Sequence, residues 1–376
     1  MKLLINNNRV DWESSKSHYF FNPRHPESHN LKKLAKQLPC FKSHIYLFTS
    51  NYGKICLLSK QAFLESAQAV NKHLQVKEKD VWLIGLPLFH VAGLSILARQ
   101  FCAGFSVIKS SNSWNPKSFK KELSEKKVSL CSLVPSQLYD LTAQKIRSPK
   151  SLRALIIGGD SLSPFLYRQA RELGWPVLIS YGLTETSSQI ACSPLSSLNK
   201  QSYPKMGLLN HALVKNKPAR VKSACLLTAY FDVEKKQLIP ALDSKGFFKL
   251  PDRTLFKNRQ LVFLGRREEE IKILGERVDF KKLSFLLEKL AQNLKKEVYL
   301  LAVPDRRRGK KLVLITNGFD FLKIFLLVKK FNQKVLPFEK IQAIYSVSRI
   351  KKSHLTKFRQ KKALQQLAFD TEDEKS

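Results

Sequence analysis

The chain has 376 residues, of which 43% are hydrophobic, so it is long and apolar enough to bury a large core and to form two or three domains. Its 66 Lys and Arg residues against 30 Asp and Glu give a formal net charge of +36, which favours polyanionic partners. This length and hydrophobic content indicate a globular protein, and no repeats or low-complexity tracts appear.

In the first half of the chain, short apolar runs alternate with amphipathic stretches. The runs are rich in β-branched and aromatic residues, so they are expected strands. They occupy residues 43–50, 80–87, 104–110, 128–135, 152–159 and 175–182. The amphipathic stretches at 60–74 and 116–126 are expected helices. This alternation predicts parallel strands with helices on both faces of the sheet.

After about Lys200 the pattern changes to short strands separated by Gly, Pro, Asp and Asn, which predicts a small barrel-like β subdomain. These strands are expected at residues 223–231, 246–252 and 259–266. From Gly265 onward we expect a small α+β unit. Its expected helices are residues 281–294 and 321–331, and its expected strands are residues 298–303 and 311–316. The predicted fold class is α/β, with stacked α/β subdomains and the β subdomain in a large N-terminal region.

The segment from Val81 to Ala98 carries no charge and is about long enough to span a bilayer. Pro87, His90 and two glycines interrupt it, so we expect a buried strand, loop and helix instead. The N-terminal apolar stretch is too short for a secretory signal. Six widely spaced cysteines indicate neither a metal site nor a disulfide framework, and they fit a reducing compartment. We therefore expect a cytoplasmic protein.

The run SYGLTETSSQ, residues 180–189, gathers in one loop the groups that a phosphoanhydride needs. Gly182 allows the backbone to approach a ligand closely, and Thr184 offers a hydroxyl group. Glu185 offers a carboxylate for Mg²⁺, which prefers oxygen ligands, and Tyr181 offers a flat face. Taken alone, the run is equally consistent with a polar turn after a buried strand.

Four further motifs accompany this loop in a fixed order. They are PLFHVAGLSIL at 87–97, LVPSQLYDL at 133–141, LRALIIGGDSLS at 152–163 and LGRREEEIKILGERV at 264–278. Together the five motifs resemble the adenylate-forming superfamily of acyl-CoA synthetases, luciferases and adenylation domains. Within it, TETSSQ, VPSQL and the pair GFFKLPDR and NRQLVFLGR are most similar to the o-succinylbenzoate-CoA ligases of menaquinone biosynthesis. The resemblance runs from about Phe41 to the end of the chain.

This resemblance implies a domain organisation and an activity. It implies an AMP-dependent synthetase/ligase N-terminal domain at 1–264 and a small, mobile C-terminal AMP-binding lid domain at 265–376, with a hinge at Glu268. The implied reaction uses ATP and Mg²⁺ to convert o-succinylbenzoate to an acyl-adenylate and then transfers the acyl group to CoA. A CoA ligase for another aromatic or fatty carboxylic acid is the first alternative.

For the nucleotide, the resemblance implies that Thr184 contacts the α-phosphate and that Glu185 coordinates Mg²⁺. It also implies that Asp252 holds the ribose hydroxyls and that Arg266 reaches the nucleotide, although a turn residue and a surface cation would look the same. The other residues expected to bind ATP are Thr49, Ser50, Gly53 and Lys54 in the phosphate loop, and Gly158, Gly159, Asp160, Tyr181 and Gly182 around the adenine.

The phosphate loop departs from the family pattern. Small residues are needed there so that backbone N–H groups can cradle phosphates. Here the stretch TSNYGKICLLSK is shorter, and Tyr52 is bulky. The family's GGE also reads LGE, at residues 274–276. A non-catalytic nucleotide-binding homologue is therefore the second alternative.

For the acid, the resemblance implies that His90 lines the acyl pocket, although a lone histidine in an apolar run is usually a core residue. Arg99 closes that run and needs either a carboxylate or solvent. Because o-succinylbenzoate has a second carboxylate that is not activated, Arg99 is its candidate partner. The resemblance adds Ser136, Ser188 and Gln189 to this site.

The family's C-terminal lysine is best matched by Lys357, in RIKKSHLTKFRQKKAL, with Thr356 where glycine is usual. A solvated basic helix face is the alternative for this stretch. The positive charge suits ATP and CoA, and a lysine-rich solvated surface is its simplest explanation. No zinc-finger spacing, RNA-binding signature or heptad is found, so nucleic acid is not expected as a partner. A peripheral contact with a membrane and the oligomeric state stay open.

Overall fold

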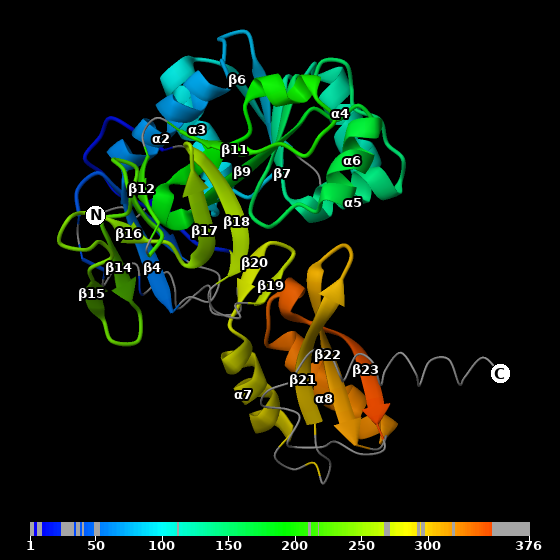
Figure 1. Cartoon of the computed structure of the whole chain (residues 1–376). Coiled ribbons are helices and arrows are strands. Elements are labelled where there is room, and N and C mark those ends of the chain that lie inside the picture. The colour runs from blue at the N-terminus through cyan, green and yellow to red at the C-terminus, as the bar shows by residue number, and fades with distance from the viewer. Residues whose placement is uncertain are drawn as a thin grey trace. The chain divides into compact units, whose positions relative to one another are not determined.

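The computed structural model describes most of the chain. The described residues are 4–5, 10–23, 34, 38–39, 41–48, 53–110, 113–209, 212–216, 218–266, 271–291, 294, 298–317 and 320–347. The chain divides into two compact units (Figure 1). The first unit comprises residues 1–23 and 27–269, and the second comprises residues 24–26 and 270–376.

The first unit is built on a nine-stranded sheet in the order β17-β18-β11-β10-β9-β8-β7-β5-β6. Its parallel strands are β5 (Val81–Ile84), β6 (Ser106–Lys109), β7 (Leu130–Leu133), β8 (Ala154–Ile157) and β9 (Val177–Leu183). The helices are α2 (Lys60–His73), α3 (Val91–Ala103), α4 (Pro116–Glu125), α5 (Pro135–Ala143) and α6 (Pro164–Glu172). Helices α2 and α3 cover one face, and α4, α5 and α6 cover the other (Figure 1). The predicted parallel sheet between two helical layers is confirmed for five of the six expected strands. The prediction is wrong for the run at 43–50, which forms β3 (His44–Phe48) in a second sheet and pairs antiparallel with the next strand of the chain.

Side chains of the parallel strands alternate between the two faces, as the two-residue period of a strand requires. Those packed under α4, α5 and α6 are Leu83, Cys131, Leu133, Leu155 and Ile157. Those packed under α2 and α3 are Trp82, Ile84, Leu130, Ala154 and Ile156. Because both faces are buried, these strands read as continuous apolar runs in the sequence.

The helix starts follow from local sequence. Ser59, Asn115 and Ser163 each precede a helix, and each accepts a hydrogen bond from the backbone N–H of the residue three positions later. In α4 and α6 the next residue is a proline, whose fixed φ suits the first helical position. At the other end of α3, Gly104 takes φ 71°, which ends the helix.

The remaining strands of the first unit are antiparallel or short. The nine-stranded sheet is completed by β10 (Ser188–Cys192), β11 (Met206–Leu208), β17 (Asp252–Lys257) and β18 (Gln260–Arg266). A six-stranded sheet contains β1 (Leu4–Ile5), β2 (His18–Phe20), β3 (His44–Phe48), β4 (Lys54–Ser59), β14 (Ala229–Asp232) and β15 (Gln237–Ile239). A three-stranded sheet contains β12 (Leu213–Lys215), β13 (Arg220–Lys222) and β16 (Phe248–Lys249). The β-strands predicted after Lys200 are thus shared among three sheets.

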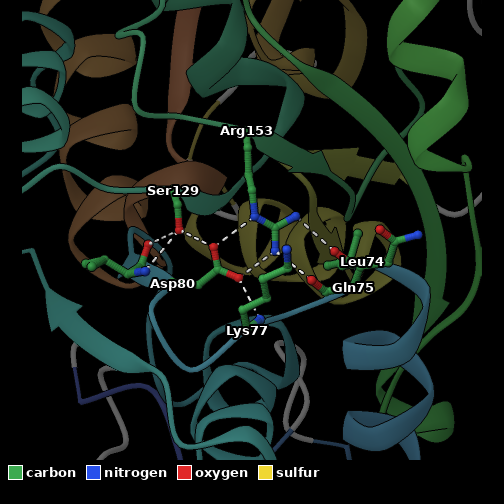
Figure 2. A network of polar contacts seen from close by, with 7 residues as sticks. Leu74, Gln75, Lys77, Asp80, Ser129 and Arg153 are labelled. Atoms are coloured by element: carbon green, nitrogen blue, oxygen red, sulfur yellow. Dashed lines mark hydrogen bonds and ion pairs between the residues drawn. The ribbon is translucent and has the colours of Figure 1, made fainter.

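A polar network joins the amino ends of the parallel strands (Figure 2). Arg153, just before β8, donates from Nε and Nη2 to the two carboxylate oxygens of Asp80, at 2.8 and 2.6 Å. Ser129, just before β7, donates to Asp80 at 2.7 Å, and the Lys77 N–H donates to it at 2.8 Å. Burial by itself would raise the pKa of Asp80, but these hydrogen bonds outweigh burial and hold the pKa at about 2. The network therefore fixes this edge of the sheet around a permanently charged pair.

The second unit is a small α+β fold. Its three-stranded sheet contains β21 (Val298–Asp305), β22 (Gly309–Asn317) and β23 (Ile341–Val347). One face of this sheet packs against α7 (Phe280–Ala291) and α8 (Phe321–Gln333). The hairpin of β19 (Ile271–Ile273) and β20 (Glu276–Val278) precedes α7. The two helices and two strands predicted here from periodicity are present within a few residues of their expected ends.

The uncharged segment from Val81 to Ala98 folds as β5, a loop and the first part of α3, as predicted. Within the described part of the chain, no helix has both the length and the apolar character that crossing a bilayer requires.

Candidate active site

The loop predicted to bind phosphate forms a tight hairpin between β9 and β10, closed by the short helix η1 (Thr184–Thr186). The Thr186 hydroxyl accepts from the Leu183 N–H at 2.9 Å and donates to the Ser188 carbonyl at 2.7 Å. A Cβ at Gly182 would lie 2.1 Å from the Ser188 carbonyl oxygen, so only glycine allows these strands to approach. The Thr184 hydroxyl makes no hydrogen bond within the described residues, which leaves it available to a ligand.

Glu185 projects from this hairpin and is only 6% exposed. Its Oε1 accepts a 2.7 Å hydrogen bond from the hydroxyl of Tyr230 on β14. The ammonium group of Lys54, the first residue of β4, lies 5.5 Å from the centroid of the same Tyr230 ring. The structure thus brings together the predicted metal ligand and the predicted phosphate-loop lysine, with Tyr230 between them.

Tyr230 was not predicted as a site residue. The stretch LLTAYF shows only that it lies on a strand, and the residue it contacts on the opposite hairpin is 45 positions away. Its link to Lys54 depends on the antiparallel pairing of β4 with β14, in which Tyr230 faces Cys56 and Asp232 faces Lys54. No local sequence signal reports that pairing.

The carboxyl ends of the parallel strands gather several other predicted residues. In the order β9-β8-β7-β5-β6, strand β5 is followed by β6 on one side and then by β7 on the other, which makes a topological switch point. His90 lies in the loop after β5 and Ser136 at the start of α5 after β7. His90 is half-buried beside Phe89, with ring centroids 4.6 Å apart, and Ser136 is buried. Ligands of open α/β sheets bind in the crevice at such a point.

The segment after β8 supplies the wall predicted for the adenine. A Cβ at Gly158 would lie 2.7 Å from the Ser180 hydroxyl on β9, and Gly159 takes φ 84°. Both positions therefore favour glycine. Asp160, which is half-buried, accepts a 2.8 Å hydrogen bond from the Ser161 N–H.

Tyr181 and Asp252, predicted for the adenine and the ribose, are in direct contact. The Tyr181 hydroxyl donates to Asp252 Oδ2 at 2.8 Å, and Asp252 is 1% exposed. The two residues are 71 positions apart and come from β9 and from the start of β17. In the β17–β18 pairing the Cα atom of Asp252 faces that of Arg266. The backbone thus brings three of the predicted nucleotide residues to one place.

Arg99 lies in the second half of α3, one turn before its last turn, and is 2% exposed, so the alternative of a side chain that reaches solvent at a helix end is wrong. Its Nη2 donates to the hydroxyls of Ser95 and Ser188, at 3.2 and 2.7 Å, and to the side-chain oxygen of Gln189. Its guanidinium carbon lies 5.0 Å from the Trp82 ring centroid. Burial lowers the pKa of Arg99 to about 10, which leaves it charged at neutral pH.

No carboxylate of the described residues forms an ion pair or hydrogen bond with Arg99. The two β10 residues predicted for the acid, Ser188 and Gln189, are the ones that hold its guanidinium. The structure therefore joins three of the predicted acid-site residues around a buried, uncompensated positive charge.

Several predicted residues lie outside what the structure describes. They are Thr49, Ser50, Glu268 and Lys357, together with the side chain of Arg266. Gly53 and Lys54 are described, and a Cβ at Gly53 would meet nothing within 4 Å, so glycine is not required there by packing. In the LGE motif, Leu274 and Gly275 have φ 55° and 83° and form the two-residue turn between β19 and β20. Leucine thus occupies a left-handed position that glycine would adopt more easily.

The donor groups fit a magnesium ion that is shared with a nucleotide. Among the described residues, no group of three or more His, Cys, Asp or Glu side chains could hold a metal ion. Mg²⁺ is commonly held by one or two carboxylates together with substrate phosphates, and it does not need a cage of protein ligands. Within the described part of the chain, Glu185 uses only Oε1 in a side-chain hydrogen bond, so Oε2 is available for such an ion.

Comparisons with known proteins agree with this geometry. Residues 53–218 match the family model "AMP-binding enzyme". The 2-succinylbenzoate-CoA ligase of Escherichia coli (strain K12) is 28% identical over 265 residues, which are 70% of this chain and 55% of that protein. The ligase of the same name from Bacillus subtilis (strain 168) is 28% identical over 222 residues, 56% of this chain and 45% of that protein. The chain thus spans about half the length of these curated relatives.

Among solved structures, the fold is similar to that of an o-succinylbenzoate CoA synthetase from Bacillus subtilis bound with its product analogue OSB-NCoA. The TM-score is 0.66 at 22% identity, and the match covers 82% of this chain and 66% of that chain. The family model and the curated relatives confirm the resemblance to adenylate-forming enzymes inferred from the motifs, and the solved structure shows a similar fold.

Proposed function

From this relationship to the adenylate-forming enzymes we propose that the protein is an acid-thiol ligase, which first joins o-succinylbenzoate to AMP and then to CoA. The observation that carries the proposal is the meeting of residues distant in sequence. Tyr181 bonds to Asp252, and Glu185 and Lys54 share Tyr230. The backbone fold alone does not require these polar side chains to be in contact, whereas a nucleotide site does.

In the first step, an oxygen of the acid's carboxylate attacks the α-phosphorus of ATP, and pyrophosphate leaves. Negative charge grows on the phosphate oxygens, so fixed positive groups and hydrogen-bond donors accelerate the step. We assign Thr184 to the α-phosphate, and we assign Lys54 with Thr49, Ser50 and Gly53 to the outer phosphates. Mg²⁺, when bound, would be held by Glu185 and would neutralise part of the phosphate charge.

The nucleoside end of ATP is assigned to the edge formed by β8, β9 and β17. Tyr181 with Gly182 and the segment Gly158, Gly159 and Asp160 would enclose the adenine. Asp252 would accept hydrogen bonds from the ribose hydroxyls, and Arg266 would reach the nucleotide from the facing strand. The Tyr181 hydroxyl donates to Oδ2 of Asp252, so the ribose would meet a carboxylate that the fold already orients.

The acid is assigned to the region between the loop after β5, the start of α5 and β10. His90 and Ser136 would line the pocket, and Ser188 and Gln189 would orient Arg99. The buried guanidinium has no carboxylate partner among the described residues, and the second carboxylate of o-succinylbenzoate would supply one. A ligase for a different carboxylic acid would keep the nucleotide residues and differ here.

In the second step the sulfur of CoA attacks the acyl carbon and AMP leaves. We propose that residues 265–376 form the lid domain that follows the 1–264 N-terminal domain, with Glu268 as the hinge between two conformations. Lys357 would act in the first conformation and the LGE turn in the second. The free cysteines, of which Cys56, Cys131, Cys192 and Cys225 are buried, fit a cytoplasmic location.

The test is pyrophosphate release from the purified chain with ATP, Mg²⁺ and o-succinylbenzoate, followed by CoA thioester formation. Chelation of Mg²⁺ and the Glu185→Ala variant should each abolish pyrophosphate release. Lys357→Ala should suppress adenylate formation and leave the conversion of supplied acyl-adenylate to thioester largely intact. If none of the acids in an aromatic panel leads to pyrophosphate release, the non-catalytic alternative is favoured. The shortened phosphate loop is the observation that supports this alternative.

A further inference from the structure

Glu185 is a buried carboxylate whose orientation depends on a neutral donor. The Tyr230 hydroxyl, 2.7 Å from Oε1, makes its one side-chain hydrogen bond within the described residues. No lysine or arginine of that part of the chain forms an ion pair with it. A carboxylate that is 6% exposed has few water contacts to hold it, so the Tyr230 hydroxyl determines where Glu185 points.

The same tyrosine also contacts the phosphate-loop lysine. Lys54 begins β4 where the chain leaves the phosphate loop, and it is exposed. Its ammonium group lies 5.5 Å from the Tyr230 ring centroid, within the range of a cation–π interaction. One side chain therefore touches both charged groups assigned to the phosphates of ATP, through its hydroxyl on one side and its ring on the other.

The position of Tyr230 is fixed by the sheet and does not depend on the loop. On β14 it pairs with Cys56 of β4, while the flanking Phe231 and Ala229 are buried on the opposite face. The Leu227 N–H donates at 2.9 Å to the carbonyl of Glu185, so the start of this strand is also tied to the metal-ligand hairpin. The pairing of β4 with β14 thus sets the distance between Lys54, at the start of β4, and the β9–β10 hairpin that carries Glu185.

We propose that Tyr230 is the positioning residue of the metal-phosphate site. Its hydroxyl occupies Oε1 of Glu185 and leaves Oε2 for Mg²⁺, and its ring holds the ammonium group of Lys54 near the outer phosphates. This inference rests on the proposed function, and it states how a shortened phosphate loop would still serve ATP. Glu185 and Lys54 are here positioned by Tyr230 on β14 and not by a long phosphate loop.

Two substitutions separate the hydroxyl from the ring. Tyr230→Phe keeps the ring under Lys54 and removes the hydrogen bond to Glu185. A partner of this kind behind a metal ligand is typically worth 10- to 100-fold in metal affinity, so we expect a loss of roughly that size. Tyr230→Leu also removes the ring, and because a cation–π contact at an exposed site is worth about 0.5–1 kcal/mol, it should weaken nucleotide binding by a further two- to fivefold.

The matched control is Tyr203→Phe. The Tyr203 hydroxyl also makes a 2.7 Å hydrogen bond, but it donates to the backbone carbonyl of Leu162 and involves no carboxylate. Tyr203 is 41% exposed and has no part in the proposed site. Its loss should leave metal and nucleotide binding unchanged, so it separates the effect of a lost phenol from the effect of a lost contact to Glu185.

The measurement is the binding of Mn²⁺ to the full chain in the presence of α,β-methylene-ATP, followed from the signal of free Mn²⁺ in electron paramagnetic resonance. Thermal unfolding of each variant checks that it is folded, and the half-saturating Mg²⁺ concentration for pyrophosphate release is a second readout. We expect Tyr230→Phe to weaken Mn²⁺ binding at least tenfold, with an unchanged unfolding midpoint, while Tyr203→Phe resembles the parent.

The outcomes distinguish this inference from the proposed function. If Glu185→Ala loses Mn²⁺ binding and Tyr230→Phe retains it in full, the positioning role is wrong and the metal assignment stands. If Glu185→Ala binds Mn²⁺ as the parent does, the metal assignment itself is wrong, and the role of Tyr230 falls with it. Should Tyr230→Phe unfold, Tyr230→His, which keeps a ring and a hydrogen-bond donor, is compared with Tyr230→Leu in the same assay. Equal Mn²⁺ affinity in these two variants would overturn the positioning role.

Discussion

Two arginines of the first unit meet opposite electrostatic surroundings. Arg153 donates to both carboxylate oxygens of Asp80 at the amino ends of the parallel strands, at 2.8 and 2.6 Å (Figure 2). Arg99, within the described residues, donates from the same kind of group to neutral hydroxyl and amide oxygens of α3 and β10. One positive charge is matched inside the fold, and the other is not.

Under the proposed function, the matched charge serves the fold and the unmatched charges bind a ligand. A charge buried without a counter-charge costs free energy, and a bound ligand of opposite charge would offset that cost. Glu185 repeats the pattern with the opposite sign, because its described side-chain partner is the neutral hydroxyl of Tyr230. Unmatched buried charges of this kind concentrate at functional sites.

The largest effect should come from the unmatched carboxylate. Glu185→Gln keeps an oxygen acceptor for Tyr230 and removes the negative charge. Loss of one group that stabilises transition-state charge typically lowers the rate by about 10²–10³-fold, and we expect that loss in pyrophosphate release. The exposed Glu125, which pairs with Lys121 at 3.7 Å on α4, provides the control: Glu125→Gln should leave the rate unchanged. Equal rates for both variants would place Glu185 among the charges that serve only the fold.

The matched pair should instead respond in stability. Asp80→Ala leaves the guanidinium of Arg153 without its carboxylate, and breaking a buried pair costs about 3–5 kcal/mol. Because the Arg153 side chain is 32% exposed, we expect about 2–3 kcal/mol, measured by urea unfolding. Catalytic rate per folded molecule should not change. A normal unfolding free energy with a reduced rate would reverse the assignment of the two regions.

How much of this was visible in the sequence follows from the range of each interaction. The strand at 128–135 and the helix at 60–74 were predicted because their apolar periods are local. The loop at 180–189 was predicted because Gly182, Thr184 and Glu185 are adjacent in the chain. Such features depend on neighbouring residues, and the structure contains them at the predicted positions.

The contacts that separate the two regions are long-range, and the sequence did not report them. Asp80 and Arg153 are 73 residues apart, and KEKD before the strand reads as an ordinary polar turn. Likewise, the sequence left open whether Arg99 reaches solvent, because that depends on β10, whose residues lie about 90 positions away. Strand order and register decide these partners, and neither is encoded in a local pattern.

The third prediction tests whether Arg99 binds the second carboxylate of the substrate. Arg99→Met keeps a side chain of similar length against Trp82 and removes the charge. Loss of a charge-assisted hydrogen bond costs roughly 1.5–3 kcal/mol, so the apparent KM for o-succinylbenzoate should rise about ten- to a hundredfold. Use of an aromatic acid with a single carboxylate should change little, where such an acid is accepted.

The same variant sharpens the comparison with Asp80. Because the buried charge of Arg99 has no counter-charge among the described residues, its removal should cost less unfolding free energy than Asp80→Ala. Equal increases in apparent KM for both acids, together with a large loss of stability, would show that Arg99 supports the fold. The second carboxylate of the substrate would then lack a partner in the proposed site.

The smallest effect is the pH dependence of the matched pair. The pKa of Asp80 is about 2 in the folded chain, below its ordinary value of 3.8, so the unfolded chain takes up this proton more readily. The stabilisation is fully present above about pH 4 and is lost as the pH falls through 4 towards 2, with a total of about 2 kcal/mol. Asp80→Asn cannot titrate, so the difference in unfolding free energy between parent and variant should shrink by most of that amount between pH 5 and pH 2.5. Ser129→Ala removes a single hydrogen bond to the same carboxylate and should shift this acid limb only slightly towards higher pH. A difference that stays constant over the whole range would mean that Asp80 is not held in its charged form by Arg153, and the contrast between the two arginines would lose its electrostatic basis.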